Sequence, residues 1–172
     1  LKSVSICAKM DTDSTASTIQ QKQAGNYFDT FFTFNFDYDK LNQKYKSSYG
    51  FRSNYGLNVP IISDTNTLTN TYNFKIFNEF FENNITSFSI SLASTNSISS
   101  DDVKLSERLF IPSRRLRGFE SGKIGPKDGD DFIGGNYSAT FNAQTNIPSI
   151  FQNFQDIDAV MFFDVGSLWG VD

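Results

Sequence analysis

The sequence predicts an all-β fold, an antiparallel transmembrane β-barrel of which this chain forms an incomplete curved sheet of about seven strands. Large apolar side chains are frequent, with 19 Phe among 172 residues, yet the mean hydropathy is −0.35. Apolar and polar residues alternate along several segments, as in strands whose successive side chains point to opposite faces. No apolar run approaches the roughly 18 residues that a transmembrane helix needs.

The alternation marks seven candidate strands. Near 27–38, aromatic residues occupy all the even positions except Thr30, and polar residues occupy most of the odd ones. The other candidate strands lie near residues 2–10, 49–59, 71–81, 85–94, 137–147 and 157–169. We expect one face to be convex and to face lipid. Residues expected on it include Phe28, Phe32, Phe34, Phe74, Phe88, Ile90, Phe141 and Phe163.

Polar connectors separate these strands. They cover residues 11–24, 39–48, 61–68, 82–84, 95–133 and 148–156. The 95–133 connector is far longer than an ordinary loop, which indicates either a function or disorder. Long loops at one end and short turns at the other are typical of barrels. Both ends of the sequence fall in or near a strand, so we expect residues 1–172 to be part of one barrel domain of a longer protein.

A soluble β-sandwich would produce similar alternation. Its outward faces would be rich in Lys and Glu, whereas the polar faces here consist mostly of Ser, Thr, Asn and Gly. Such faces fit a water-filled lumen better, so the pattern favours a membrane barrel and leaves the sandwich as the alternative.

The composition argues against several classes of function. The net charge of −4 gives no indication of a nucleic-acid surface, and the absence of His removes His-based triads and the commonest metal ligand. Asp128, Asp130 and Asp131 lack the complete spacing of a Ca²⁺-binding loop. Asp156 and Asp158, a conceivable catalytic pair, lie at a turn and are expected to be solvent-exposed. We therefore predict no enzyme activity, no cofactor and no nucleic-acid partner.

Short motifs occur in a fixed order in the last third of the chain. They are Leu116-Arg117-Gly118-Phe119 in the long connector, Gly134-Gly135 before a strand, and Phe162, Asp164 and Gly166 in the final strand. This ordered set resembles the BamA-type family, also called the bacterial surface antigen family. The motifs cover about residues 105–172, and the earlier strands fit the family without carrying a signature.

The resemblance implies a sixteen-stranded barrel preceded by periplasmic POTRA domains, with strands seven to thirteen in this chain. It implies a factor that folds and inserts β-barrel proteins into the bacterial outer membrane. The implied partners are the lipid bilayer, lipopolysaccharide, client β-barrel proteins and accessory lipoproteins. Related barrels of two-partner secretion and TamA-type systems share the loop motif, and a porin-like surface antigen is a third alternative. The number of POTRA domains would discriminate among them.

The resemblance also implies a contact inside the barrel. The long loop should fold into the lumen and bring Arg117 to Asp164. Gln144 stands where many members of the family have Glu, so one negative charge is missing near the arginine. Because Gln144 and Asp164 both fall on the polar face of their strands, an arginine in the lumen can reach them. We expect residues 112–126 on the concave face, with Gln144 adding at most one hydrogen bond.

Other residues of the loop have weaker signals. Gly118 permits a tight turn beside the arginine, and we expect Phe119 to pack against the barrel wall. Arg108, Arg114 and Arg115 surround Arg117 in the sequence. Most loop arginines are solvated, and the pattern alone favours that interpretation for Arg117, whereas the motif favours the lumenal contact.

Overall fold

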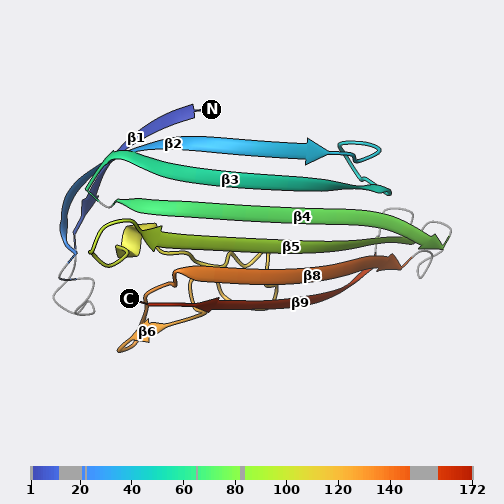
Figure 1. Cartoon of the computed structure of the whole chain (residues 1–172). Coiled ribbons are helices and arrows are strands. Elements are labelled where there is room, and N and C mark those ends of the chain that lie inside the picture. Colours follow the sequence, from blue (N-terminus) through green and yellow to red (C-terminus); the bar gives the residue numbers. More distant parts are fainter. Residues whose placement is uncertain are drawn as a thin grey trace.

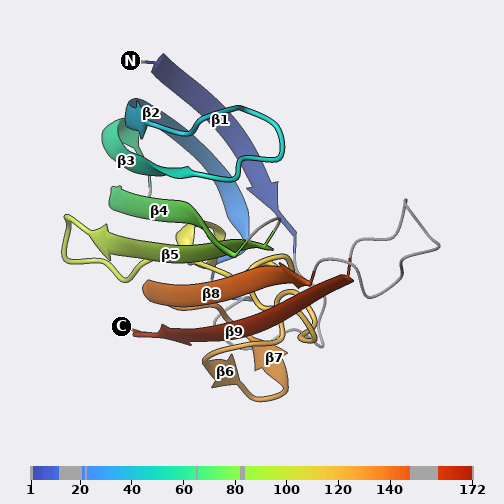
Figure 2. The same cartoon turned by 90° about the vertical axis from the view of Figure 1, so that its right-hand side faces the viewer.

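A computed structural model of the chain describes residues 2–11, 21, 23–64, 66–81, 84–147 and 159–171. Seven strands form one antiparallel sheet in which each strand pairs with the next along the chain (Figure 1). They are β1 (Lys2–Met10), β2 (Gly25–Asp39), β3 (Gly50–Ser63), β4 (Thr67–Phe81), β5 (Asn84–Ser97), β8 (Tyr137–Ile147) and β9 (Ala159–Trp169). The sheet is open and curved (Figure 2), which confirms the predicted fold class.

The predicted connector 61–68 is mostly strand, because β3 continues to Ser63 and β4 begins at Thr67. In the pairing with β2, Ile62 lies opposite Thr30 and Pro60 lies opposite Phe31, so Ile61 is an extra residue. A β-bulge of this kind shifts the alternation of apolar and polar residues by one position. The alternation therefore did not predict a strand across this segment.

One short connection lies at the end of the sheet that carries the long loop. The short connection at 64–66 lies at the same end as the long loop between β5 and β8. The expected separation of long loops from short turns is therefore wrong at this position. Most of the predicted connectors 11–24, 82–84 and 148–156 lie outside the described residues.

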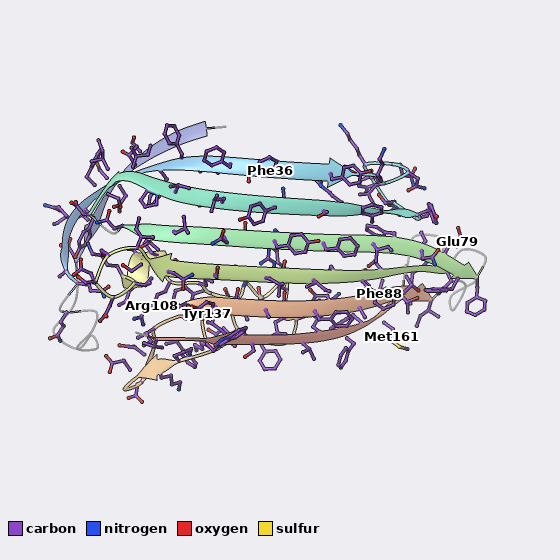
Figure 3. All side chains as sticks on the ribbon, viewed as in Figure 1. Phe36, Glu79, Phe88, Arg108, Tyr137 and Met161 are labelled. Atoms are coloured by element: carbon purple, nitrogen blue, oxygen red, sulfur yellow. The ribbon has the colours of Figure 1, made fainter. Side chains whose placement is uncertain are left out.

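The outer, convex face of the sheet is apolar. Ile90 of β5 pairs with Phe74 on one side and Phe141 on the other. The rings of Phe88 and Phe141 stack with centroids 6.3 Å apart, and Phe163 is 61% exposed. Figure 3 shows aromatic side chains spread along these strands, with Phe88 labelled. The register places all the residues predicted for the convex face on this one face, and no second large sheet covers it in the described part of the chain, which excludes the sandwich.

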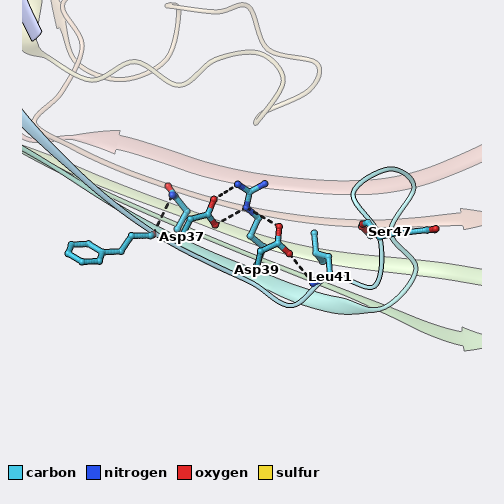
Figure 4. Close-up of polar contacts among 8 residues, drawn as sticks. Asp37, Asp39, Leu41 and Ser47 are labelled. Atoms are coloured by element: carbon cyan, nitrogen blue, oxygen red, sulfur yellow. Dashed lines mark hydrogen bonds and ion pairs between the residues drawn. The ribbon is translucent and has the colours of Figure 1, made fainter. Parts of the chain in front are cut away.

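The inner face is polar and carries charges near the end of β2. The guanidinium of Arg52 makes two hydrogen bonds to the carboxylate of Asp37, one of them from Nε to Oδ1 at 2.9 Å. The same Nε lies 3.7 Å from Oδ2 of Asp39. Figure 4 shows Asp37 and Asp39 side by side, with these contacts drawn as dashed lines. Charged groups here pair with one another, as expected for a face turned away from lipid.

The long loop runs from residue 98 to residue 136 and crosses the inner face. It contains a short 3₁₀ turn, η1 (Leu105–Glu107), and a hairpin of β6 (Lys127–Asp128) and β7 (Asp131–Phe132). Its buried side chains Ile111 and Leu116 pack against Leu168 of β9. The main apolar core therefore lies between the loop and the inner face of the sheet. Among the described residues, no helix is long and apolar enough to span a bilayer.

Candidate functional site

Arg117, in the long loop, makes a bidentate contact with Asp164 of β9. Nε donates to Oδ2 and Nη2 donates to Oδ1, both at 2.7 Å. The backbone N–H of Arg117 also donates to Oδ2, at 3.0 Å. The Asp164 side chain is 3% exposed and that of Arg117 is 30% exposed. The contact predicted between the two residues is therefore present, with three hydrogen bonds, and the loop lies on the predicted face of the sheet.

Neighbouring strands complete the surroundings of the arginine. Oε1 of Gln144 on β8 accepts a hydrogen bond from Nη1 of Arg117 at 2.8 Å, as expected for a single neutral partner. The ring of Phe162 lies under the guanidinium, with its centroid 3.8 Å from Cζ. An arginine held by a carboxylate, an amide and an aromatic face has little rotational freedom.

Asn142 is the residue of this site that sequence reasoning missed. Its Nδ2 donates to Oδ1 of Asp164 at 2.8 Å and to the backbone carbonyl of Arg115 at 2.6 Å. Asn142 lies directly opposite Asp164 in the β8–β9 register. Asn142 lies two residues before Gln144 and therefore on the same polar face. This position in the sequence could have identified it as part of the site.

Electrostatics keep the arginine charged. The hydrogen bond to Asp164 raises the pKa of Arg117 above its ordinary value, although burial acts in the opposite direction. The guanidinium is therefore positive at any pH at which the protein is folded, and the contact is an ion pair. Because the carboxylate is almost completely buried, loss of the arginine would leave a charge without an ionic partner.

Leu116, beside the arginine, fixes the loop by apolar contact. Its side chain is 4% exposed and packs in the cluster with Ile111 and Leu168. Gly166 of β9 leaves the room that Leu116 occupies, because a Cβ there would lie 3.3 Å from Cδ1 of Leu116 and 3.0 Å from Cγ2 of Thr140. The glycine of the last-strand motif therefore allows the loop to approach the sheet closely.

The Gly134-Gly135 pair joins the end of the loop to its beginning. Gly135 exchanges two backbone hydrogen bonds with Leu109, at 2.9 and 3.1 Å. Gly134 has a φ of +72°, which favours glycine. A Cβ on Gly135 would lie 2.8 Å from the backbone oxygen of Trp169. The pair therefore lets the loop backbone pass between Leu109 and the end of β9.

The expectation for Phe119 is wrong for the strands that this chain supplies. Its side chain is 58% exposed and lies outside the apolar cluster. Gly118 has a φ of +88° and the N–H of Phe119 donates to the carbonyl of Leu116, so the chain turns sharply after Arg117. The turn directs Leu116 and Arg117 towards the sheet, and Phe119 away from it.

The remaining candidates fall in different places. Among the described residues, no group of three Asp, Glu or Cys side chains could hold a metal ion. Asp128 and Asp131 lie opposite each other in the β6–β7 hairpin. Asp156 and Asp158 lie outside the described residues. Arg108 is buried within the loop, where Nε donates to the carbonyl of Val103.

Comparisons with known proteins agree with this architecture. A relative described as "Outer membrane protein assembly factor BamA" from Neorickettsia risticii is 25% identical over 166 residues, which cover 94% of this chain and 22% of the relative. The crystal structure of BamA from Haemophilus ducreyi lacking POTRA domains 1–3 superposes with a TM-score of 0.76 at 24% identity, covering 84% of this chain and 31% of that one. The chain thus spans about a fifth of the length of the relative. Since residues 2–172 match the Omp85 superfamily domain, the chain belongs to this superfamily of bacterial outer-membrane barrel proteins.

Proposed function

We propose that this chain is a wall segment of a barrel that folds and inserts other β-barrel proteins into the outer membrane. The whole protein would be a sixteen-stranded barrel preceded by POTRA domains, and residues 1–172 would belong to that one barrel domain. The observation that carries the proposal is the loop held on the inner face by Arg117 and Asp164, in a chain similar to an outer membrane protein assembly factor.

The loop would act as a brace, a segment that fixes neighbouring strands relative to one another from inside the barrel. Its arginine contacts β9 through Asp164 and β8 through Gln144. Arg115 reaches further, donating from Nη2 to Oδ1 of Asn73 on β4 at 2.9 Å. A barrel that opens at a seam to accept a client strand needs a wall that keeps its shape elsewhere, and this network supports that role.

The partners follow from the two faces of the sheet. The apolar outer face suits the lipid bilayer, and we propose that it also meets lipopolysaccharide at the loop end, where the rings of Tyr137 and Trp169 stack. Client β-barrel proteins and accessory lipoproteins would bind elsewhere on the full-length protein. Nothing in this role calls for a catalytic group or a cofactor.

Depletion of the full-length protein in its source bacterium tests the proposed function. With an assembly factor, the amounts of many unrelated folded β-barrel proteins in the outer membrane should fall together, and the wild-type gene should restore them. Loss of a single exported client would instead indicate a secretion barrel. Unchanged β-barrel levels with reduced uptake of small solutes would indicate a porin.

A substitution on the outer face tests its exposure to lipid. Ile90→Arg would place a charge near the middle of the apolar face, where such a change costs about 2–4 kcal/mol in a membrane barrel. The matched control is Asn58→Arg, on the polar face opposite Thr33 and Thr69. The unfolding free energy of the full-length barrel in lipid vesicles should fall markedly for Ile90→Arg only. Equal losses would argue against the assignment of the two faces.

A further inference from the structure

A hollow of about 240 Å³ lies on the inner face beside the Arg117 contact. Lys75 of β4, Ser89 of β5 and Gln144 of β8 contribute to its wall, and Arg114 and Arg115 of the loop complete it. Every residue that lines it carries an N–H or O–H donor, and none carries a carboxylate. Its volume is below the roughly 300–1,000 Å³ of pockets for drug-sized ligands, so a small group fits it better than a large one.

The positive charge of this hollow is not neutralised by the described residues. Arg117 pairs with Asp164, whereas no described carboxylate forms an ion pair with Lys75, Arg114 or Arg115. Burial and the neighbouring Arg114 lower the pKa of Arg115. Three cations around one hollow stand out in a chain whose net charge is −4. An anion would reduce their mutual repulsion.

Arg115 is held in position before any ligand arrives. Its Nη2 donates to Asn73 at 2.9 Å, and its backbone carbonyl accepts from Asn142 at 2.6 Å. The other N–H groups of the Arg115 guanidinium remain to donate to a ligand. Their planar arrangement matches the oxygens of an oxyanion. Ser89, directly between Lys75 and Asn142 in the register, offers a hydroxyl to the same hollow.

Gln144 contributes an uncharged amide to the hollow, where a carboxylate would repel an anion. Its Oε1 is occupied by Arg117, so its Nε2 group remains as a donor at the hollow. A glutamate in the same place would bring a negative charge to the hollow while still accepting from the arginine. The absence of a charge on Gln144 therefore matters for binding an anion, whereas the hydrogen bond from Arg117 would form with either residue.

We propose that this hollow binds a phosphate group through Lys75, Arg115, Ser89 and the amide of Gln144. A tetrahedral oxyanion presents several acceptor oxygens, which match the donors that converge there, and ammonium and guanidinium groups together are suited to phosphate. The phosphate can be a free ion in the lumen or the phosphomonoester of a larger molecule, since both present the same oxygens. The site shares Arg115 and Gln144 with the proposed brace, but its binding of phosphate does not depend on the proposed assembly function.

Equilibrium dialysis of the full-length protein in detergent against labelled inorganic phosphate tests the proposal. We expect saturable binding of one phosphate per barrel, and Lys75→Gln and Arg115→Gln should each raise the Kd at least about tenfold. Lys127→Gln, in the β6 hairpin outside the hollow, is the matched control and should bind as the wild type does. Absence of saturable binding to the wild type, or equal Kd values for all variants, would overturn the proposal.

Gln144→Glu separates binding from folding. This variant keeps the acceptor for Arg117, so the heat-resistant folded form of the barrel should persist, while phosphate binding should be lost. Retained binding with an added carboxylate would contradict the site.

Repeating the dialysis with glycerol phosphate, and with lipid nanodiscs that contain phosphatidic acid, distinguishes the two possible sources of the phosphate group. Competition by soluble esters supports a lumenal ligand, and competition by the lipid alone supports a headgroup.

Discussion

Arg117→Ala in the full-length barrel is expected to lower the free energy of unfolding by about 3–5 kcal/mol, the usual cost of removing one partner of a buried ion pair. The remaining carboxylate of Asp164 is 3% exposed, and Asn142 would be its only described side-chain partner. The loop would also lose the side-chain hydrogen bonds from Arg117 to β8 and β9. Urea unfolding in detergent micelles, followed by tryptophan fluorescence, measures the loss.

A double-mutant cycle identifies the pair as the cause. Asp164→Asn should also destabilise the barrel, and the double variant should be barely worse than either single variant because both remove the same contact. Gln144→Ala removes one hydrogen bond and should cost about 1 kcal/mol. Additive losses for Arg117 and Asp164 would show that the two side chains act independently, which would exclude the brace.

The sheet could be predicted from the sequence because its signal is local. Alternation with period two identifies a strand and its faces without knowledge of its partners, and all seven strands were found in this way. The pattern failed at Ile61, where one extra residue inverts the alternation. A bulge is defined by pairing with a neighbouring strand, so a single strand's sequence does not reveal it.

The loop was less predictable, because its residues are positioned by contacts distant in sequence. The motif predicted the contact between Arg117 and Asp164. It did not indicate that Leu116, rather than Phe119, packs against the barrel wall. That choice depends on the turn at Gly118 and on the space above Gly166. Asn142 was missed for a related reason, because only the β8–β9 register places it opposite Asp164.

Gly135→Ala is expected to release the beginning and end of the loop from β9. The new methyl group would lie 2.8 Å from the carbonyl oxygen of Trp169 and 3.1 Å from its nitrogen. These are backbone atoms of a paired strand, which cannot move aside as a flexible side chain would. Overpacking of this kind costs about 1–3 kcal/mol. The backbone bonds between Gly135 and Leu109 would be the first to weaken.

Limited trypsin digestion of the folded full-length barrel measures this release, because the loop contains Arg114 and Arg115. A cost of this size raises the population of the opened loop by roughly 5- to 150-fold, and cleavage should accelerate in proportion when opening is fast. The control is Gly129→Ala in the β6–β7 hairpin, where φ is +64° and a Cβ would meet no atom within 4 Å. Its strain of about 1–2 kcal/mol stays in the hairpin, so cleavage should remain at the wild-type rate. If Gly135→Ala is cleaved no faster than this control, the glycine pair does not hold the loop, and the loop's position depends on its other contacts, which include those of Leu116, Arg115 and Arg117.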